Sequence, residues 1–127
     1  MIPDEKPFSQ ACEENMHHWP NDAFDGIFSA NTAHIMSTPA VAAMLTGIGR
    51  VLEPGGAFAL YGPFNYDGRY ASQSNADFDV WLKRRDPDSG IKAFEAVDTL
   101  ARANGLSFEA DHPMPVNNRI LVWRRSL

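Results

Sequence analysis

Cysteine is almost missing from this sequence of 127 residues, in which Cys12 stands alone. A single cysteine cannot form a disulfide within the chain, so we expect a reducing, cytoplasmic location. Long hydrophobic runs are missing too, because no stretch approaches the roughly 20 apolar residues that a membrane-spanning helix needs. The N-terminal stretch MIPDEKPF also lacks the basic and then apolar pattern of a signal peptide. We therefore expect no membrane partner.

Positive charge is scarce as well. Eleven Lys and Arg residues stand against sixteen Asp and Glu residues, which gives a formal net charge of −5. Nucleic-acid binding requires a clustered basic face, so we expect no nucleic-acid partner. The chain does have a hydrophobic content of 44%, which is typical of a globular domain.

The start of the chain differs from the rest. Residues 1–20 contain three prolines and show no helical or strand periodicity. We predict an irregular N-terminal arm over residues 1–18 and a single domain over residues 19–127. His17–His18 predicts no metal site, because adjacent residues face different ways on a helix or a strand and no third ligand stands at suitable spacing.

The next part of the chain predicts a strand, a helix and a second strand. Phe24–Ala30 (FDGIFSA) is a short apolar run that indicates a strand buried on both faces. Ser37 stands before Pro39 as an N-cap residue, and apolar residues then recur at helical spacing. The helix ends at Pro54-Gly55-Gly56, and Ala57–Tyr61 indicates the next strand. Such a unit is right-handed and implies a parallel sheet.

Two helices and two strands are predicted for the remainder. The first helix is capped by Ser74 or Asn75 and stopped at Asp86-Pro87. The second helix runs from about Ile91 to Asn104, and its apolar residues lie on one face. The strand candidates Leu106–Asp111 and Arg119–Arg124 follow with no helix between them, so they pair antiparallel or lie apart in the sheet. The fold class is therefore α/β.

Several stretches of the chain resemble one protein family. They are WPNDAFDGIFSANTAHIMS, the helix end RVLEPGGAF, the long phrase QSNADFDVWLKRRDPDSGI and the closing MPVNNRILVWRR. Together they resemble the C-terminal half of the DUF938 family of methyltransferase-like proteins. The similarity covers about residues 19–127.

The resemblance implies a class I methyltransferase fold, which is Rossmann-like and uses S-adenosylmethionine (SAM). Its sheet has the strand order 3-2-1-4-5-7-6 with strand 7 antiparallel. In this chain Phe24–Ala30 resembles strand 4 and Ala57–Tyr61 resembles strand 5, while the two last strand candidates resemble strands 6 and 7. We therefore expect a partial sheet of order 4-5-7-6, in which the last strand is antiparallel, with helices on both faces.

The chain departs from this family pattern in one essential part. Such methyltransferases carry a glycine-rich loop after strand 1 and an acidic residue at the end of strand 2, and these hold the cofactor. Here Gly47 and Gly49 lie within a helical pattern and Gly55–Gly56 ends a helix, so none of the nine glycines forms that loop. We expect that SAM is bound by the complete family fold and that this chain alone binds no cofactor.

Candidate cofactor-binding residues follow the first strand. Asn31 and His34 stand where strand 4 of the family fold ends, beside the place of the cofactor in the complete fold. An alternative is purely structural, with Asn31 and Thr32 bonding turn amides and His34 packing on the surface.

Candidate substrate-binding residues lie after the second strand and around the start of the following helix. Loops at the carboxyl ends of parallel strands meet in one crevice, where a methyl acceptor would be held. The residues are Tyr61, Gly62, Pro63, Asn65, Asn75 and Asp77. A packed aromatic loop and favourable acids near the helix dipole are the alternatives. No residue is assigned a catalytic role, and no metal site is expected.

Three functional hypotheses remain. The chain is part of a methyltransferase and inactive alone, or a non-catalytic interaction module, or one half of a split methyltransferase completed by a partner chain. Without strand 1, the edge of Phe24–Ala30 would be unpaired and would carry no charge after Asp25. Such an edge is a template for pairing, so we expect a homodimer through this strand.

Overall fold

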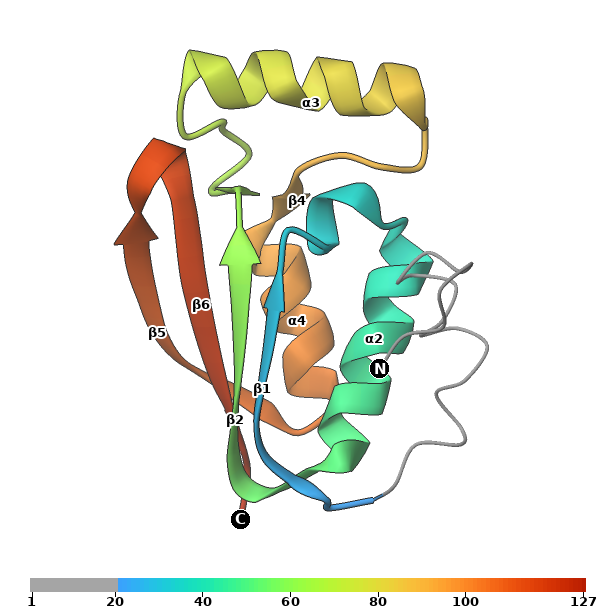
Figure 1. Ribbon diagram of the computed structural model, residues 1–127, viewed down its shortest axis with the longest axis vertical. Coiled ribbons are helices and arrows are strands. Elements are labelled where there is room, and N and C mark those ends of the chain that lie inside the picture. Colours follow the sequence, from blue (N-terminus) through green and yellow to red (C-terminus); the bar gives the residue numbers. More distant parts are fainter. Residues whose placement is uncertain (1–20) are drawn as a thin grey trace.

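A four-stranded mixed sheet forms the centre of the computed structural model, which describes residues 21–127 (Figure 1). Its strands, in spatial order, are β1 (Phe24–Ala30), β2 (Leu52–Gly62), β6 (Asn118–Arg125) and β5 (Leu106–Met114). β1 and β2 are parallel, whereas β6 runs antiparallel to both of its neighbours. In the family numbering this order is 4-5-7-6, so the predicted sheet is confirmed. The predictions for Cys12, for His17–His18 and for the arm over residues 1–18 lie outside the described residues.

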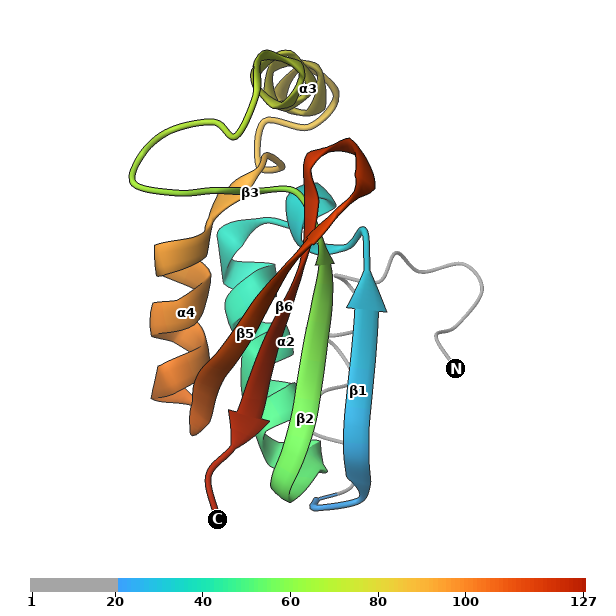
Figure 2. The same cartoon turned by 90° about the vertical axis from the view of Figure 1, so that its left-hand side faces the viewer.

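Two helices pack against the sheet, and both lie on the same face (Figures 1 and 2). They are α2 (Thr38–Val51), which connects β1 to β2, and α4 (Phe94–Ala103), which precedes β5. The expectation of helices on both faces is therefore wrong for the described part of the chain. The reason is topological: β5 is parallel to β2, and both crossovers move along the sheet in the same direction. Right-handed crossovers in one direction place their helices on one face.

The start of α2 follows the predicted capping pattern. The Ser37 side chain accepts a hydrogen bond from the Ala40 N–H at 3.2 Å, and Pro39 lies in the first turn. β2 begins at Leu52, directly after the helix, rather than at Ala57 as the Pro54-Gly55-Gly56 stretch suggested. These residues lie inside the strand, where the pairing with β1 shifts register and Gly55 adopts a φ of +83°.

The third helix, α3 (Gln73–Arg85), lies across the end of the sheet and covers neither face (Figures 1 and 2). Its N-cap is Ser72, whose hydroxyl accepts from the Asn75 N–H at 3.1 Å, and not Ser74 or Asn75 as predicted. Short strands β3 (Phe64–Asn65) and β4 (Lys92–Ala93) pair with each other on either side of this helix in the chain. No helix in the described range combines the length and the hydrophobicity that are needed to cross a membrane.

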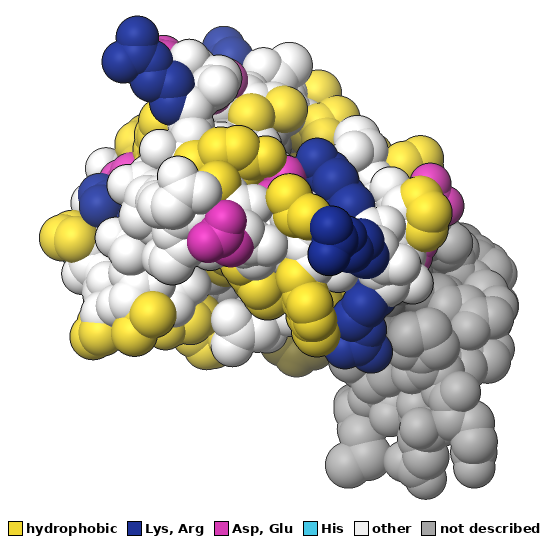
Figure 3. Space-filling model, turned by 90° about the horizontal axis from the view of Figure 1, so that it is seen from above, with side chains coloured by type: hydrophobic (Ala, Val, Ile, Leu, Met, Phe, Trp, Pro, Cys, Tyr) yellow, Lys and Arg dark blue, Asp and Glu magenta, His cyan; other side chains and the backbone are white. Residues whose placement is uncertain are grey.

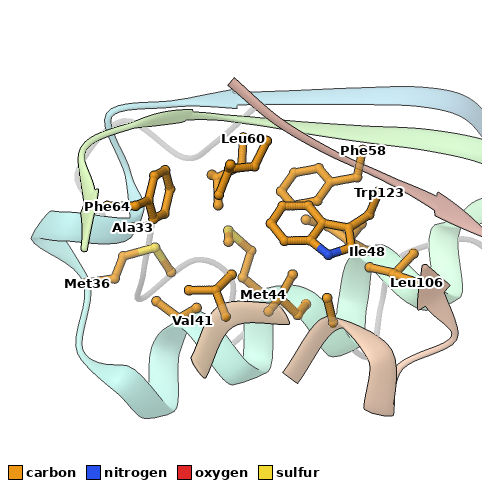
Figure 4. Packing of buried hydrophobic residues seen from close by; sticks show 14 of the residues in the cluster. Ala33, Met36, Val41, Met44, Ile48, Phe58, Leu60, Phe64, Leu106 and Trp123 are labelled. Atoms are coloured by element: carbon orange, nitrogen blue, oxygen red, sulfur yellow. The ribbon is translucent and has the colours of Figure 1, made fainter. Parts of the chain in front are cut away.

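The hydrophobic core fills the space between the sheet and the pair α2 and α4 (Figure 4). Trp123 of β6 is fully enclosed, stacks on Phe58 with ring centroids 6.0 Å apart, and donates from Nε1 to Asp98 Oδ1 at 3.0 Å. α2 approaches α4 closely at Gly49, because a Cβ atom there would lie 2.5 Å from the Asn104 carbonyl oxygen. The apolar residues that recur at helical spacing are all buried, namely Val41, Met44, Leu45, Ile48, Val51 and Leu52, of which Leu52 is the first residue of β2.

β1 forms one edge of the sheet, and its far face is open to solvent. It pairs with β2 alone among the described strands, and Phe28 is 61% exposed while Ile27 packs on the core. The prediction that this strand is buried on both faces is therefore wrong. Successive side chains on a strand point to opposite faces, and the helices cover only one of them. Phe28 pairs in register with Ala59, which pairs with Val122, so an apolar row crosses the uncovered face.

Candidate functional site

A cavity of about 270 Å³ lies at the carboxyl end of the parallel strands, where α3 crosses the sheet. The side chains that line it come from four parts of the chain and are either apolar or polar without a charge. They are Asn31, His34, Pro63, Ser74, Asn75, Phe78, Val116 and Asn118. Figure 3 shows this end of the molecule, on which hydrophobic side chains are spread among uncharged, basic and acidic ones. The carboxyl ends of parallel strands are where open α/β sheets hold their ligands.

The turn after β1 directs His34 into the molecule. Asn31 adopts a left-handed φ of +56°, and its N–H donates to the Tyr61 carbonyl at 3.0 Å, which ties the end of β1 to the end of β2. The hydroxyls of Ser29 and Thr32 bond to each other at 2.7 Å across the same turn. The 3₁₀ turn η2 (Ala33–Ile35) follows, and His34 within it is only 7% exposed.

His34 is held between an aromatic ring and the backbone. Its ring lies 5.5 Å from the ring of Phe78 at an interplanar angle of 58°, and its carbonyl accepts from the Gly90 N–H at 2.9 Å. The Nδ1 atom is enclosed and has no hydrogen-bond partner. Such an atom costs about 1–3 kcal/mol when nothing pairs with it. It therefore needs an explanation other than stability.

Asn75 on α3 shares this property. The residue is 6% exposed, and its Nδ2 atom is enclosed without a hydrogen-bond partner. The backbone N–H of Asn75 is occupied by the cap Ser72, so the position of the residue is fixed while its side-chain amide is left unpaired. The cavity is thus lined by two buried polar side chains that each retain an unused nitrogen.

The carboxylate of Asp79 fixes α3 in place. It is 2% exposed and accepts from the Tyr70 hydroxyl, from Lys83 Nζ at 2.9 Å and from the Ile91 N–H at 2.8 Å. Burial alone would raise the pKa of Asp79, but these three hydrogen bonds outweigh it and leave the pKa below its usual value. Asp79 and Lys83 stand four residues apart on α3 and form an ion pair.

Electrostatics make the cavity neutral. Burial lowers the pKa of His34, and the charge of Lys92 lowers it further, so the imidazole is uncharged at neutral pH. Lys92 itself donates from Nζ to the Met36 and Gly90 carbonyls at 2.7 Å and 2.8 Å. No Asp, Glu, Lys or Arg side chain is among the residues that line the cavity.

The β5–β6 loop lines part of the cavity in a strained conformation. Within the 3₁₀ turn η3 (Pro115–Asn117), Val116 has φ +61° and ψ +39°, and Asn117 has φ +60°. This left-handed region is unfavourable for a β-branched residue. Val116 is nevertheless 83% exposed, so packing of its own side chain does not account for the strain.

The structure brings together half of the residues predicted for the site. Asn31, His34, Pro63 and Asn75 line the same cavity although they come from three separate parts of the chain. The other four do not line it: Tyr61, Gly62, Asn65 and Asp77. Asp77 also lies beyond the first turn of α3, where it accepts from Gln73 Nε2 at 3.0 Å, so the predicted interaction with the helix N-terminus is absent.

Sequence reasoning missed four lining residues, and one signal would have found two of them. Ser74 and Phe78 were assigned to a helix alone, and Val116 and Asn118 to a connection. The strand before that connection is parallel to β2, so its carboxyl end necessarily lies beside the ends of β1 and β2. No group of three or more His, Cys, Asp or Glu side chains within residues 21–127 is placed to hold a metal ion.

The fold of this chain recurs in solved structures of methyltransferases. Solved structures with the same fold include an O-methyltransferase family protein from Burkholderia thailandensis, with a TM-score of 0.74, 16% identity, and coverage of 87% of this chain and 33% of that one. An O-methyltransferase family 2 protein from Planctomyces limnophilus, in complex with apigenin, gives a TM-score of 0.76 at 14% identity over 87% and 33% of the two chains. The chain therefore has the class I methyltransferase fold.

A third solved structure is human N-acetylserotonin methyltransferase in complex with SAM. Its TM-score is 0.72 at 12% identity, and the match covers 81% of this chain and 30% of that one. The present chain thus spans about a third of the length of these structures.

The particular family follows from the sequence itself. The family model described as "Protein of unknown function (DUF938)" matches residues 5–125. The chain belongs to the DUF938 family, as the resemblance of its motifs indicated.

Proposed function

We propose that this chain forms the acceptor-binding side of a SAM-dependent methyltransferase of the DUF938 family, and that it transfers no methyl group by itself. The convergence of Asn31, His34, Pro63 and Asn75 on one cavity at the carboxyl ends of β1 and β2 is the observation that carries this proposal. Family membership and the methyltransferase fold support it. Positioning an acceptor contributes greatly to the rate of a group transfer, so a cavity that binds and orients it is the part such a chain would supply.

The described residues do not fit SAM as a whole. The parallel strands β1 and β2 are followed by Asn31 and Pro63, so neither carries a carboxylate at its end for ribose hydroxyls. The one glycine pair of G-x-G spacing, Gly47 and Gly49, lies inside α2 and is buried. For this reason we assign the cavity to the acceptor.

A second candidate function is an interaction module without catalysis. The uncovered face of the sheet favours it, because Phe24 and Phe28 on the edge strand are 48% and 61% exposed. A row of apolar side chains beside an unpaired strand edge is suited to association with another chain.

Calorimetry with SAM tests the two proposals. We expect no saturable binding to the chain alone, whereas a dissociation constant in the low micromolar range, about −8 kcal/mol, would contradict the proposal. The same titration is then repeated with residues 21–127 fused behind the glycine-rich half of another DUF938 protein. The fused protein should bind SAM and transfer a radiolabelled methyl group to a component of a small-molecule cell extract.

Two substitutions make the second experiment specific to the cavity. Phe78→Ala removes a lining ring and should abolish labelling while SAM binding by the fusion persists. Val80→Ala is the control, since Val80 is an exposed apolar residue of α3 that lies outside this cavity. A fusion that binds SAM and is equally active with Phe78→Ala would refute the role of the cavity, and a fusion that never binds SAM would favour the interaction module.

A further inference from the structure

We infer that the cavity binds a neutral, planar molecule of about one ring, which accepts a hydrogen bond from the side chain of Asn75 and pairs with the imidazole of His34. This inference rests on the proposed function for the ligand's role as a methyl acceptor. The chemistry of the ligand follows from the cavity alone and is tested without SAM.

The unpaired nitrogens give the first argument. His34 and Asn75 are more than nine-tenths buried, line the same cavity, and each keeps one enclosed nitrogen without a partner. Buried polar atoms are nearly always paired, and exceptions call for an explanation such as a bound group. A carbonyl oxygen would satisfy the amide nitrogen of Asn75, and an N–H, an O–H or a further oxygen would satisfy the imidazole nitrogen, according to its tautomer.

The lining explains why the ligand is neutral. Asn31, Ser74, Asn75 and Asn118 are polar but uncharged, and His34 is held uncharged by burial and by Lys92. An ionised ligand would lose its hydration here without meeting an opposite charge, which is strongly unfavourable. A carboxylate or a phosphate is thereby disfavoured relative to an amide of the same shape.

Volume and aromatic surroundings explain why the ligand is small and flat. A space of about 270 Å³ is slightly smaller than the usual range for ligand pockets, roughly 300–1,000 Å³. Phe78 offers a ring face beside the imidazole of His34, and Pro63 adds an apolar wall. Aromatic rings favour offset or tilted contacts with another ring, so a single substituted ring matches this space.

The strained loop explains how such a ligand is enclosed. Val116 lines the cavity yet is 83% exposed, in a backbone conformation that is unfavourable for valine. Strain of this kind persists at ligand clamps, where bound contacts compensate for it. We therefore expect Val116, which borders the cavity, to contact a bound ring.

A pair of isosteric probes tests the inference directly. Benzamide is neutral and planar and carries a carbonyl and an N–H donor, whereas benzoate has the same shape with a negative charge. Each is titrated into ¹⁵N-labelled chain at pH 7.5 and followed by amide chemical shifts. We expect saturable shifts at His34, Asn75, Phe78 and Val116 with benzamide, and binding at least tenfold weaker with benzoate.

Two variants locate the binding site. Asn75→Ala removes one hydrogen bond to the ligand and should weaken benzamide binding about threefold to tenfold. Asp77→Asn, two residues further along the same helix and exposed, should leave it unchanged. Circular dichroism checks that both are folded, and the comparison of benzamide with benzoate needs no variant.

Three results would overturn the inference. They are no saturable shift with either probe, benzoate binding as tightly as benzamide, and benzamide shifts that lie away from the cavity or do not respond to Asn75→Ala. Methyl transfer enters none of these readouts. A chain that binds benzamide but fails in the fusion experiment would therefore keep the ligand site and lose the proposed function.

Discussion

On the helix-covered face of the sheet, Phe58, Leu60, Leu121 and Trp123 are fully enclosed, and the one polar atom among their side chains, Nε1 of Trp123, donates to Asp98. At the carboxyl end, His34 and Asn75 are almost as deeply buried, but each leaves a nitrogen unpaired. The depth of burial is similar, and the energetic consequence is opposite. Enclosed apolar area stabilises the fold, whereas an enclosed unpaired nitrogen costs about 1–3 kcal/mol.

This difference assigns stability and ligand binding to two different regions of a small chain. The covered face provides the stability, and the carboxyl end keeps unsatisfied groups, left-handed backbone and a cavity in one place. Unpaired polar groups and strained backbone that border a cavity at the carboxyl ends of parallel strands are typical of a binding site. Substitutions on the covered face should therefore change stability alone, and those at the carboxyl end should change binding more than stability.

The largest effect is expected on the covered face. Trp123→Ala would leave a cavity in the core and would deprive Asp98 Oδ1 of its donor, so we expect a loss of about 3–5 kcal/mol in the free energy of unfolding. Urea denaturation followed by circular dichroism measures it. Trp81→Ala, at a position 49% exposed on α3, should cost less than about 1 kcal/mol. Equal losses for the two variants would contradict the assignment of stability to the covered face.

An intermediate effect is expected at Asp79, whose hydrogen bonds hold α3 in place. Asp79→Asn keeps the size of the side chain but weakens its bonds to Tyr70, Lys83 and the Ile91 N–H, with an expected loss of about 1–3 kcal/mol at pH 7. Because the pKa of Asp79 in the folded chain lies below its ordinary value of 3.8, its contribution is present above that value. It is lost as the pH falls through the lower folded pKa.

The pH dependence gives this prediction a second readout. The difference in unfolding free energy between the natural chain and Asp79→Asn should be constant from pH 7 to pH 5 and should shrink below about pH 4. Asp77→Asn is the control, since Asp77 is exposed on the same helix. A difference that stays constant down to pH 2.5 would show that the charge of Asp79 does not stabilise α3.

A smaller effect, opposite in sign, is expected in the β5–β6 loop. Val116→Gly relieves the left-handed strain, worth about 1–2 kcal/mol, while the added freedom of the unfolded chain offsets roughly half of it. We expect a gain of about 0.5–1 kcal/mol in stability together with weaker benzamide binding. Val116→Ala removes the side chain but keeps the strain. If the glycine variant is no more stable than the alanine variant, the conformation of Val116 is not a source of strain.

Local patterns in the sequence predicted the fold well wherever a residue has a single structural role in its context. The hydroxyl of Ser37 before Pro39 and the three-and-four spacing of apolar residues gave the start and the buried face of α2. The predicted N-cap of α3 was wrong because three candidate cap residues, Ser72, Ser74 and Asn75, stand within four positions, and the spacing of hydrophobic residues in that helix is weak. Local spacing does not decide among cap residues that stand this close together.

The candidate site was half predictable for a similar reason. Residues after β1 and β2 could be placed at one edge of the sheet because parallel strands end together. Phe78 and Val116 reach the cavity only because α3 crosses that edge and because the β5–β6 loop adopts a left-handed turn. Both depend on contacts between distant parts of the chain. The open face of β1 was misjudged because a strand that is buried on both faces and a strand with one solvent-exposed apolar face can have the same apolar sequence.

The smallest effect on stability is expected on the uncovered face, where Phe28→Lys should change the free energy of unfolding by less than about 0.5 kcal/mol. Phe28 is 61% exposed and belongs to an edge strand that pairs with β2 alone among the described elements. The part of β1 after Asp25 contains no charged residue and no proline, which are the features that usually prevent edge strands from pairing. A two-fold contact between two copies of β1 would pair both edges. We therefore predict a homodimer that Phe28→Lys converts to a monomer, because a lysine at the centre of an edge strand opposes pairing. Light scattering across a tenfold dilution series measures the mass, and Val80→Lys, at an exposed position on α3, is the matched control. If the natural chain has a monomeric mass at every concentration, the edge of β1 is not an association surface. Substitutions at Trp123 and Phe28 would then differ only in how much they change the free energy of unfolding.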